Sequence, residues 1–403
     1  MKVVKVEGNA YSSTVEPQFY PFWAGTRIHT KRDAVIYKVS TDEGYVGYGE
    51  GSLGGLKYLK DINETIVGED PSNIEGIWKK VGLIIKDEAT LYPAMAGIDV
   101  ALYDIVGKAT GKSVCELLGG RKRDKVRVYS SAGLYQPPEG YAREARSFAE
   151  LGFKGYKFRP GIGPKGDLEA VKAIRDAVGD DFKIMVDAHT WWGALGGGGF
   201  SYSPATVRLL AKEFVKLNVY FLEDPYHQED LVLYKDLKNV APDLKIANSM
   251  GRTLSGINKI MEEGDVDIVQ FDVGSKGFTM CKKLAMMVRK KGKLFINHVW
   301  GTRLASIQNA QFSATLSEEE SPWCEFPIYT TAKVKSMYRF PLAEEVLTEP
   351  LEVNGSYIKI PEKPGLGVKV NEEALTKYPY VSGPLANHVY NPSIPIWEGM
   401  GAR

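Results

Sequence analysis

The sequence has little of what several protein classes require. Its three cysteines, Cys115, Cys281 and Cys324, are too few and too scattered for a disulfide framework or a zinc knuckle. No apolar run approaches the roughly 18 residues of a membrane span, and the start MKVVKVEGN resembles an amphipathic strand rather than an export signal. Charge of one sign is not in excess either, because 51 Lys and Arg face 50 Asp and Glu, which gives no sign of a nucleic-acid or membrane partner. We therefore expect a cytoplasmic enzyme that uses a small molecule.

The first part of the chain mixes strand and helix patterns. Hydrophobic residues make up 44% of the sequence and charged residues 25%, which suits a folded protein with a sizeable core. Residues 33–40 and 45–50 alternate apolar and polar positions around a turn cluster and predict a β-hairpin. Residues 92–110 repeat apolar side chains at helical spacing. We interpret residues 1–125 as an α+β module.

A repeat of strand and helix patterns follows. After a first strand at 126–133, short apolar runs end in a polar residue at Arg159, Asp187, Glu223, Asn248, Asp272, His298 and Glu325. These ends are separated by 28, 36, 25, 24, 26 and 27 residues, which is about the length of a strand, a helix and two loops. The spacing therefore predicts βα units and a parallel sheet.

Eight strands at this spacing favour a closed (β/α)₈ TIM-type barrel over residues 126–350. A doubly wound open sheet is the alternative, but the chain lacks the glycine-rich phosphate turn that such a sheet normally carries. Residues 1–125 would form a cap, and we expect the turn-rich segment 351–403 to pack back on that cap. In barrels the catalytic groups lie at the carboxyl ends of the strands, which is where the polar residues fall here.

Asp187 and Glu223 end consecutive predicted strands. Two carboxylates that converge at a barrel mouth repel each other unless a cation neutralises them, and Mg²⁺ prefers oxygen ligands of this kind. One such acid could simply cap a following helix. Two adjacent ones favour a metal site.

Two histidines are candidates for proton transfer. Asp272 and His298 end neighbouring strands, and a carboxylate beside an imidazole raises its basicity near neutral pH. His189 lies two residues beyond Asp187, so its side chain leaves the same strand end on the same side. Each histidine could instead be a satisfied structural residue, which spacing alone does not exclude.

Lys157 and Arg159 alternate on one strand and point to one side. Cations inside a barrel mouth suit a substrate carboxylate or a developing oxyanion, although a solvated pair is an equal alternative. Glu325 could hydrogen-bond an enolic oxygen if protonated, or cap the final βα turn.

The motifs K-x-R, V-D-A-H, F-L-E-D-P, Q-F-D-V-G-S-K-G, N-H and C-E, in this order, closely resemble the enolase superfamily, in its mandelate racemase-like subgroup. AMAGIDVALYDIVGKATGKSVCELLGG and PGLGVKVNEEAL also resemble that family, so the likeness covers nearly the whole chain. The resemblance implies a modified barrel under an α+β cap, with Mg²⁺ stabilising the enediolate formed when the proton α to a carboxylate is removed.

By position, the resemblance implies a role for each strand-end residue. Asp187 and Glu223 match metal ligands, Asp272 and His298 match a catalytic dyad, Lys157 and Arg159 match the K-x-K pair, and Glu325 matches the acid on the enolate side. Asp187 with His189 resembles the D-x-H of the galactonate and mannonate dehydratases, in which the histidine serves the leaving hydroxyl.

Three departures from the family pattern bear on the chemistry. The usual third carboxylate ligand is missing from IANSMGRT, where Asn248 is the best oxygen donor and Ser249 and Met250 are alternatives. The usual second lysine is Arg159, whose guanidinium stays protonated and is a poor base. The usual Q-P-D is Gln270-Phe271-Asp272, a milder change.

These features together favour a Mg²⁺-dependent dehydratase of an aldonate, because a racemase needs a base on each face of the substrate. A racemase or epimerase that uses Lys157, and a non-catalytic sugar-acid-binding relative with a degenerate metal site, are the alternatives. Candidate substrate-binding residues are Tyr20, Trp23, Arg27, His29 and Trp300, although the aromatics of 15–30 could equally pack against another subunit. The family is usually oligomeric, so we expect a homo-oligomer.

Overall fold

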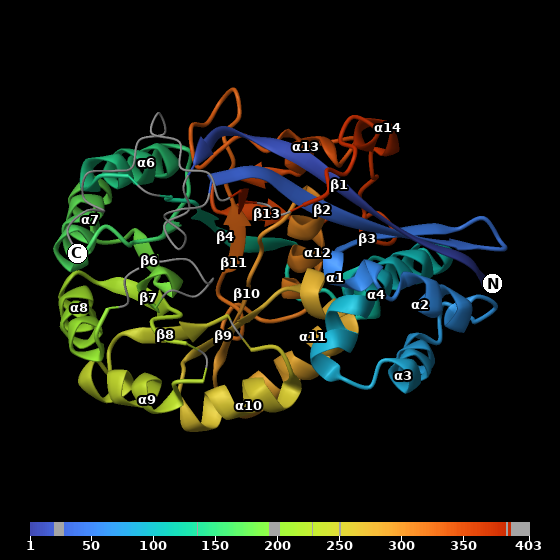
Figure 1. Cartoon of the computed structure of the whole chain (residues 1–403), viewed down its shortest axis with the longest axis horizontal. Coiled ribbons are helices and arrows are strands. Elements are labelled where there is room, and N and C mark those ends of the chain that lie inside the picture. The colour runs from blue at the N-terminus through green and yellow to red at the C-terminus, as the bar shows by residue number, and fades with distance from the viewer. Residues whose placement is uncertain are drawn as a thin grey trace.

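A closed barrel positions the strand-end residues at one mouth. The computed structural model describes residues 1–19, 28–134, 136–192, 202–227, 229–249, 251–383 and 386–387. In that part of the chain, eight parallel strands run in order and close where β11 pairs with β4 (Figure 1). They are β4 (Lys125–Ser131), β5 (Gly155–Phe158), β6 (Lys183–Asp187), β7 (Val219–Glu223), β8 (Lys245–Asn248), β9 (Ile268–Phe271), β10 (Leu294–Asn297) and β11 (Cys324–Pro327). The predicted barrel is confirmed.

Helices cover the outside of the barrel, so the outward-facing side chains of its strands are buried. They are α6 (Pro138–Glu150), α7 (Pro164–Val178), α8 (Pro204–Lys216), α9 (Leu231–Val240), α10 (Leu254–Glu263), α11 (Val273–Lys290) and α12 (Arg303–Ser313). Local signals start several of them. The Ser203 side chain accepts from the Thr206 amide with Pro204 in the first turn, and Thr253 caps α10 in the same way.

A layer of side chains fills the barrel below the mouth. It consists of Tyr129, Met185, Phe221, Ala247, Ile268, Ile296 and Trp323, all of them buried. Side chains two residues apart on a strand point to the same side. Asp187 and Glu223, each two residues beyond a member of this layer, therefore project into the barrel one level nearer its mouth.

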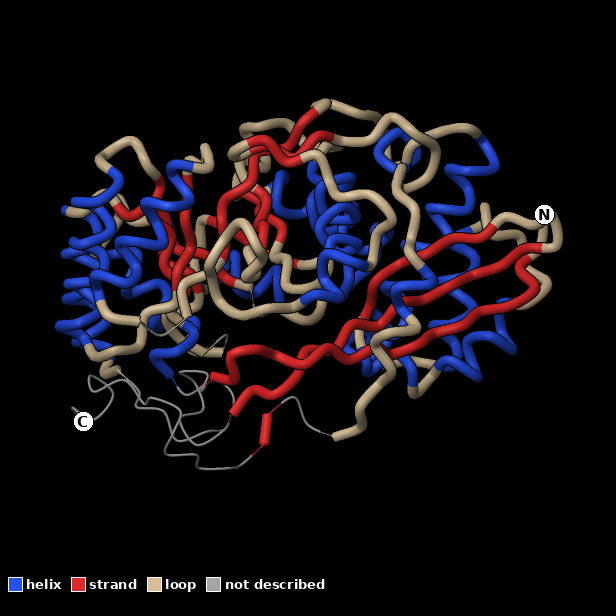
Figure 2. The backbone as a smooth tube through the Cα atoms, turned by 90° about the horizontal axis from the view of Figure 1, so that it is seen from above, coloured by secondary structure: helices blue, strands red, loops and turns tan. Residues whose placement is uncertain are grey.

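The cap is an antiparallel sheet with helices on one side. Strands β1 (Val3–Phe19), β2 (Ile28–Thr41) and β3 (Val46–Gly51) run alongside the barrel, as Figure 2 shows. The helices of this part are α1 (Leu53–Leu56), α2 (Leu59–Ile66), α3 (Ile74–Ile84), α4 (Glu88–Thr110) and α5 (Val114–Leu117). The pairing of β2 with β3 confirms the predicted hairpin.

Helix α4 is long and apolar enough to cross a membrane, but most of its apolar stretch is buried inside the protein. It packs closely on β3, since a Cβ at Gly47 would lie 2.0 Å from the Ala101 carbonyl oxygen and one at Gly49 would lie 2.2 Å from that of Gly97. Only glycine permits this approach. α4 is therefore the core helix of the cap.

The C-terminal segment contacts both bodies. Its short elements are α13 (Pro341–Glu345), β12 (Val353–Asn354), β13 (Tyr357–Lys359), α14 (Glu372–Leu375) and β14 (Ala386–Asn387). Strand β13 pairs with β4 of the barrel, whereas the Leu366 amide donates to Asp104 of α4 and β14 pairs with β2. The segment thus ties the cap to the barrel.

Asp99 of α4 fixes the cap to a break in barrel helix α11. The helix is interrupted at Gly277, with φ 72°, and Asp99 accepts hydrogen bonds from the Thr279 amide at 3.1 Å, the Thr279 hydroxyl at 2.5 Å and the Trp78 indole at 2.6 Å. A Cβ at Gly277 would lie 2.7 Å from Asp99 Oδ2. Burial raises the pKa of Asp99 to about 6 although these hydrogen bonds act in the opposite direction.

We expect Asp99→Ala to lower the free energy of unfolding by about 3 kcal/mol, because it leaves three buried donors without an acceptor. Urea denaturation followed by circular dichroism measures the change. Asp181→Ala removes an exposed carboxylate and should stay within about 0.5 kcal/mol of the wild type. Equal free energies of unfolding for the two variants would show that the Asp99 hydrogen bonds do not fix the cap to α11.

Candidate active site

One buried ammonium group contacts three carboxylates at the barrel mouth. Lys157 Nζ, from β5, lies 2.8 Å from Glu223 Oε2, 2.8 Å from Glu325 Oε1 and 3.7 Å from Asp187 Oδ2. The acids come from β7, β11 and β6, and the lysine side chain is fully buried. The sequence predictions for these four residues therefore converge on one cluster.

Arg159 adds a second cation to this cluster. Its Nε lies 3.3 Å from Asp187 Oδ2, and its Nη2 lies 3.7 Å from Glu325 Oε1. Nη1 also donates to the Ala132 carbonyl at 2.9 Å. The guanidinium lies over the Trp300 ring at 4.4 Å from the ring centre, so it is held on two sides.

Burial and neighbouring charges shift the pKa values of the residues in this cluster in opposite directions. Burial opposes ionisation of Glu325, but Lys157 and the charge of His298 lower its pKa to about 2. Burial raises the pKa of Glu223 to about 7, and the like charge of Asp187 contributes. Burial also disfavours the charged form of Lys157, yet the three carboxylates leave its pKa above the ordinary value. Glu325 is thus a carboxylate at neutral pH and Lys157 an ammonium ion.

Asp187 and Glu223 are the donors that fit a divalent cation. They are direct partners in the register of β6 and β7, and both carboxylates lie against the same ammonium group. Both are hard oxygen ligands of the kind Mg²⁺ prefers. Among the described residues, no three His, Cys, Asp or Glu form a ready metal group. Asp187 and Glu223 are therefore the carboxylate pair that the described residues offer to such a cation.

Asn248 is not brought to this pair. Ala247 points into the barrel with the filling layer, so its neighbour Asn248 points toward the helices, where its amide nitrogen donates to Tyr234 of α9 at 3.1 Å. Ser249 is the next residue on the inner side. Its amide donates to Asp224 at 3.0 Å, and its hydroxyl donates to the same carboxylate. The geometry favours Ser249, directly after β8, and its partner Asp224, directly after β7, over Asn248 as further oxygen donors.

His189 and His298 lie on different sides of the cluster. His189 Nδ1 lies 2.5 Å from Asp187 Oδ1. Asp272 directly follows β9 and caps α11 by accepting from the Gly274 amide, and the Asn309 side chain also donates to it. Burial raises the pKa of Asp272, and the charge of His298 is the largest opposing influence. His298 thus lies within the electrostatic reach of both Asp272 and Glu325, and no hydrogen bond joins the described side chains of Asp272 and His298.

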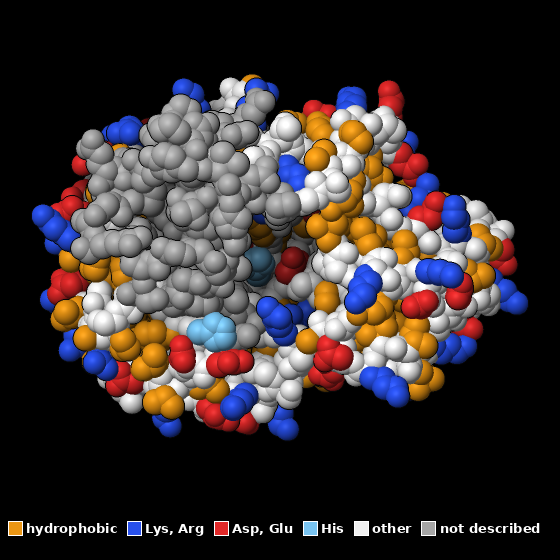
Figure 3. Space-filling model, viewed as in Figure 1, with side chains coloured by type: hydrophobic (Ala, Val, Ile, Leu, Met, Phe, Trp, Pro, Cys, Tyr) orange, Lys and Arg blue, Asp and Glu red, His pale blue; other side chains and the backbone are white. Residues whose placement is uncertain are grey.

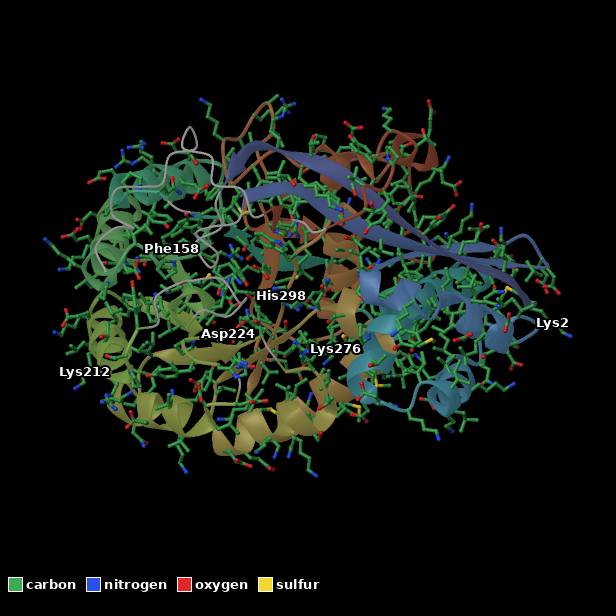
Figure 4. The ribbon with its side chains drawn as sticks, in the orientation of Figure 1. Lys2, Phe158, Lys212, Asp224, Lys276 and His298 are labelled. Atoms are coloured by element: carbon green, nitrogen blue, oxygen red, sulfur yellow. The ribbon has the colours of Figure 1, made fainter. Side chains whose placement is uncertain are left out.

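The mouth opens on the face shown in Figure 3, where acidic, basic and histidine side chains lie in and beside a hollow. Figure 4 places His298 and Asp224 near the middle of the barrel and Lys276 at its border with the cap. Charged groups from separate strand ends thus share one mouth under the cap.

Two family models match the chain. Residues 10–119 match the mandelate racemase / muconate lactonizing enzyme N-terminal domain, and residues 140–374 match the enolase C-terminal domain-like model. The chain belongs to the enolase superfamily. The predicted family, cap and barrel are therefore confirmed.

Named relatives in this superfamily are enzymes that act on small acids. The chain is 29% identical over 370 residues to D-galactarolactone cycloisomerase of Agrobacterium fabrum, covering 89% of this chain and 94% of that protein. It is 29% identical to arabinonate dehydratase of Saccharolobus solfataricus, covering 86% and 90%. The crystal structure of the 3,6-anhydro-D-galactonate cycloisomerase from Zobellia galactanivorans matches with a TM-score of 0.80, 27% identity and coverage of 94% and 99%. These names support an enzyme and do not decide its reaction.

Several residues of this enolase-superfamily site were missed by the sequence reasoning. Ser131 ends β4 and its hydroxyl donates to Glu325 at 2.5 Å, and Gln270 donates to Glu223 at 3.1 Å. Gln270 lies two residues before Asp272, and Asp224 directly follows Glu223, so strand alternation and adjacency were the available signals. Of the predicted substrate residues, Trp300 lies against Arg159. The others, Tyr20, Trp23, Arg27 and the side chain of His29, lie outside the described residues.

We expect Lys157→Met to lower the free energy of unfolding at pH 7 by about 3–5 kcal/mol, because it leaves buried carboxylates without their cation. The remaining carboxylates should take up protons more readily in the folded state than in the unfolded state. The deficit relative to the wild type should therefore shrink as the pH falls from 7 to 5. Urea denaturation at both pH values measures it.

Two further variants control this experiment. Adding Glu223→Gln to Lys157→Met removes one of the stranded charges and should recover part of the loss. Lys212→Met removes an exposed ammonium group of α8 and should change little. A Lys157→Met protein as stable as the wild type at pH 7 would show that the cluster does not need this cation.

Proposed function

We propose that the protein is a Mg²⁺-dependent dehydratase of a sugar acid of the aldonate class. It would remove the proton α to the carboxylate and eliminate the 3-hydroxyl, which gives a 2-keto-3-deoxy acid. The observation that carries this proposal is the pairing of two histidines at different strand ends with two cations that are held in their charged forms. The dehydratases among the named relatives support it.

Lys157 and Arg159 stay positively charged, which argues against a racemase that uses a base on each face of the substrate. Arg159 and Lys157 both have a pKa above their ordinary values, because the surrounding carboxylates outweigh burial. A racemase needs a neutral base on each face of the substrate. Here the K-x-R side offers positive charge, which suits binding of the substrate carboxylate and of the negative charge that develops on it.

The two histidines divide the proton transfers. His298, which lies near Asp272 and Glu325, takes the α proton, and the C–H electron pair forms the enol double bond. His189, held by Asp187, gives a proton to the hydroxyl on C3, and the C3–O bond breaks with loss of water. The enol then takes a proton from solvent at C3 and becomes the keto acid.

Asp187 and Glu223 would hold Mg²⁺, with Ser249, Asp224 or water supplying further oxygens. A bound Mg²⁺ would stabilise negative charge on the substrate carboxylate. The cytoplasmic location and the homo-oligomer stay predictions.

Two other reactions share the first step. The cycloisomerase relatives favour elimination of a ring oxygen instead of a hydroxyl, which would give an isomer of the substrate without loss of water. The N-succinyl-L-Arg/Lys racemase of Bacillus cereus, 26% identical, favours epimerisation at C2. The product mass distinguishes dehydration, which loses one water, from cycloisomerisation and epimerisation, which leave the mass unchanged. Exchange of the C2 proton without a new keto group indicates epimerisation.

A panel of five- and six-carbon aldonates with Mg²⁺ tests the proposal by the formation of 2-keto acids. We expect His298→Asn to lower kcat by about 10³-fold, since it removes the base. His189→Asn should slow loss of water while the C2 proton still exchanges with deuterium. Chelation of Mg²⁺ should abolish turnover.

His227→Asn is the matched control, because this histidine lies on the loop after β7, where it accepts a hydrogen bond from the exposed Glu229 amide. It should retain activity. Full activity of His298→Asn on the best substrate would contradict the assigned base.

A further inference from the structure

Arg32 is a partly buried cation that has no hydrogen-bonding or ionic partner among the described residues. It lies on β2 of the cap, opposite Ser13, and its Nε is buried without a hydrogen bond. Among the described arginines that are not exposed, it is the one whose guanidinium makes neither a hydrogen bond nor an ion pair. The others, Arg121, Arg123, Arg127, Arg159, Arg175, Arg208 and Arg303, all have polar partners. The neighbouring Lys31 is itself paired with Asp33 at 3.0 Å.

Trp300 links Arg32 to the barrel mouth. The Arg32 guanidinium lies 5.5 Å from the centre of the Trp300 ring, and that of Arg159 lies 4.4 Å from the same centre. The two guanidinium groups are therefore no further apart than the sum of these distances. Both guanidinium groups also influence Tyr338. Burial raises the pKa of this phenol, and the charges of Arg32 and Arg159 oppose that rise. Arg32 thus belongs to the wall of the same mouth, on its cap side.

A cation–π contact alone leaves this charge poorly compensated. Contacts of this kind contribute about 0.5–2 kcal/mol, whereas a guanidinium group can bind a carboxylate or phosphate through two parallel hydrogen bonds. Lys157 and Arg159 already face carboxylates of the protein. Arg32 faces none in the described structure, so the complementary charge is expected on a ligand.

We infer that Arg32 binds a second anionic group of the substrate, at the end remote from the carboxylate beside the reacting carbon. The substrate would then be a dianionic sugar acid, with either a second carboxylate or a phosphate ester at its far end. This narrows the sugar acids of the proposed function, and it rests on that function only for the placement of the first carboxylate between Lys157 and Arg159.

Calorimetric titration of the full chain tests this inference without turnover, in a His298→Asn background with Mg²⁺. The probes are a hexonate, the matching hexarate and the matching 6-phosphohexonate. We expect one or both dianions to bind about 10- to 100-fold more tightly than the hexonate. The dianion with the higher affinity identifies the second anionic group.

Arg32→Met should erase this preference and leave the affinity for the hexonate within about twofold, whereas Arg32→Lys should keep part of it. Arg146→Met removes an exposed arginine of α6 and should keep the full preference. If Arg32 only packs on Trp300, Arg32→Met will weaken all three probes by the same factor, and the inference is wrong. Equal binding of all three probes before substitution also overturns it.

Binding and turnover separate the two proposals. A dianion preference that depends on Arg32, with no 2-keto acid formed by the wild type, would leave the inference standing and remove the dehydratase. Dehydration of aldonates by a protein that binds dianions no more tightly than the hexonate would support the dehydratase and overturn the inference about Arg32.

Discussion

The site depends on a single buried ammonium group that keeps three carboxylates together. Lys157 meets Asp187, Glu223 and Glu325 from three strands, and Arg159 braces two of these acids from the same side. The filled layer below, which includes Met185 and Phe221, stops the side chains from sinking into the barrel. Because like charges at this density repel in a low dielectric, the acids can stay ionised only beside a cation. This arrangement is also where the proposed substrate carboxylate and divalent ion would bind.

The cap contributes buried carboxylates of its own, and each receives backbone donors from beyond the cap. Glu50, at the end of β3, accepts from the amides of Thr302 and Ala305 at 3.1 Å each and so caps α12, directly after the loop that carries His298 and Trp300. Burial raises its pKa to about 7. Asp99 accepts a hydrogen bond from the Thr279 amide beside the break in α11. Asp104 accepts one from the Leu366 amide of the C-terminal segment. The loop that bears the proposed base is thus anchored from the cap, and the cap strand β2 brings Arg32 over the Trp300 ring as well.

Sequence reasoning predicted what depends on spacing and alternation. The regular intervals between strand ends gave the barrel, and the alternation of Lys157 with Arg159 placed both cations in the mouth. It did not separate Asn248 from Ser249, because the inward side at the end of β8 follows from the register with β7. Contacts between distant segments left no local pattern, as for Asp99 with Thr279 and for β13 on β4. The role inferred for Arg32 has no sequence signature, because it depends on which groups the fold places beside the guanidinium among the described residues.

The central claim is that the mouth removes a proton α to a carboxylate, and the fate of that proton tests it most directly. The measurement is proton NMR of the reaction in D₂O with Mg²⁺ and the best sugar acid of the panel. The account predicts that the C2 proton is lost to solvent and that the keto acid carries one deuterium at C3. A product that retains the original C2 hydrogen, or a product without deuterium, would contradict it.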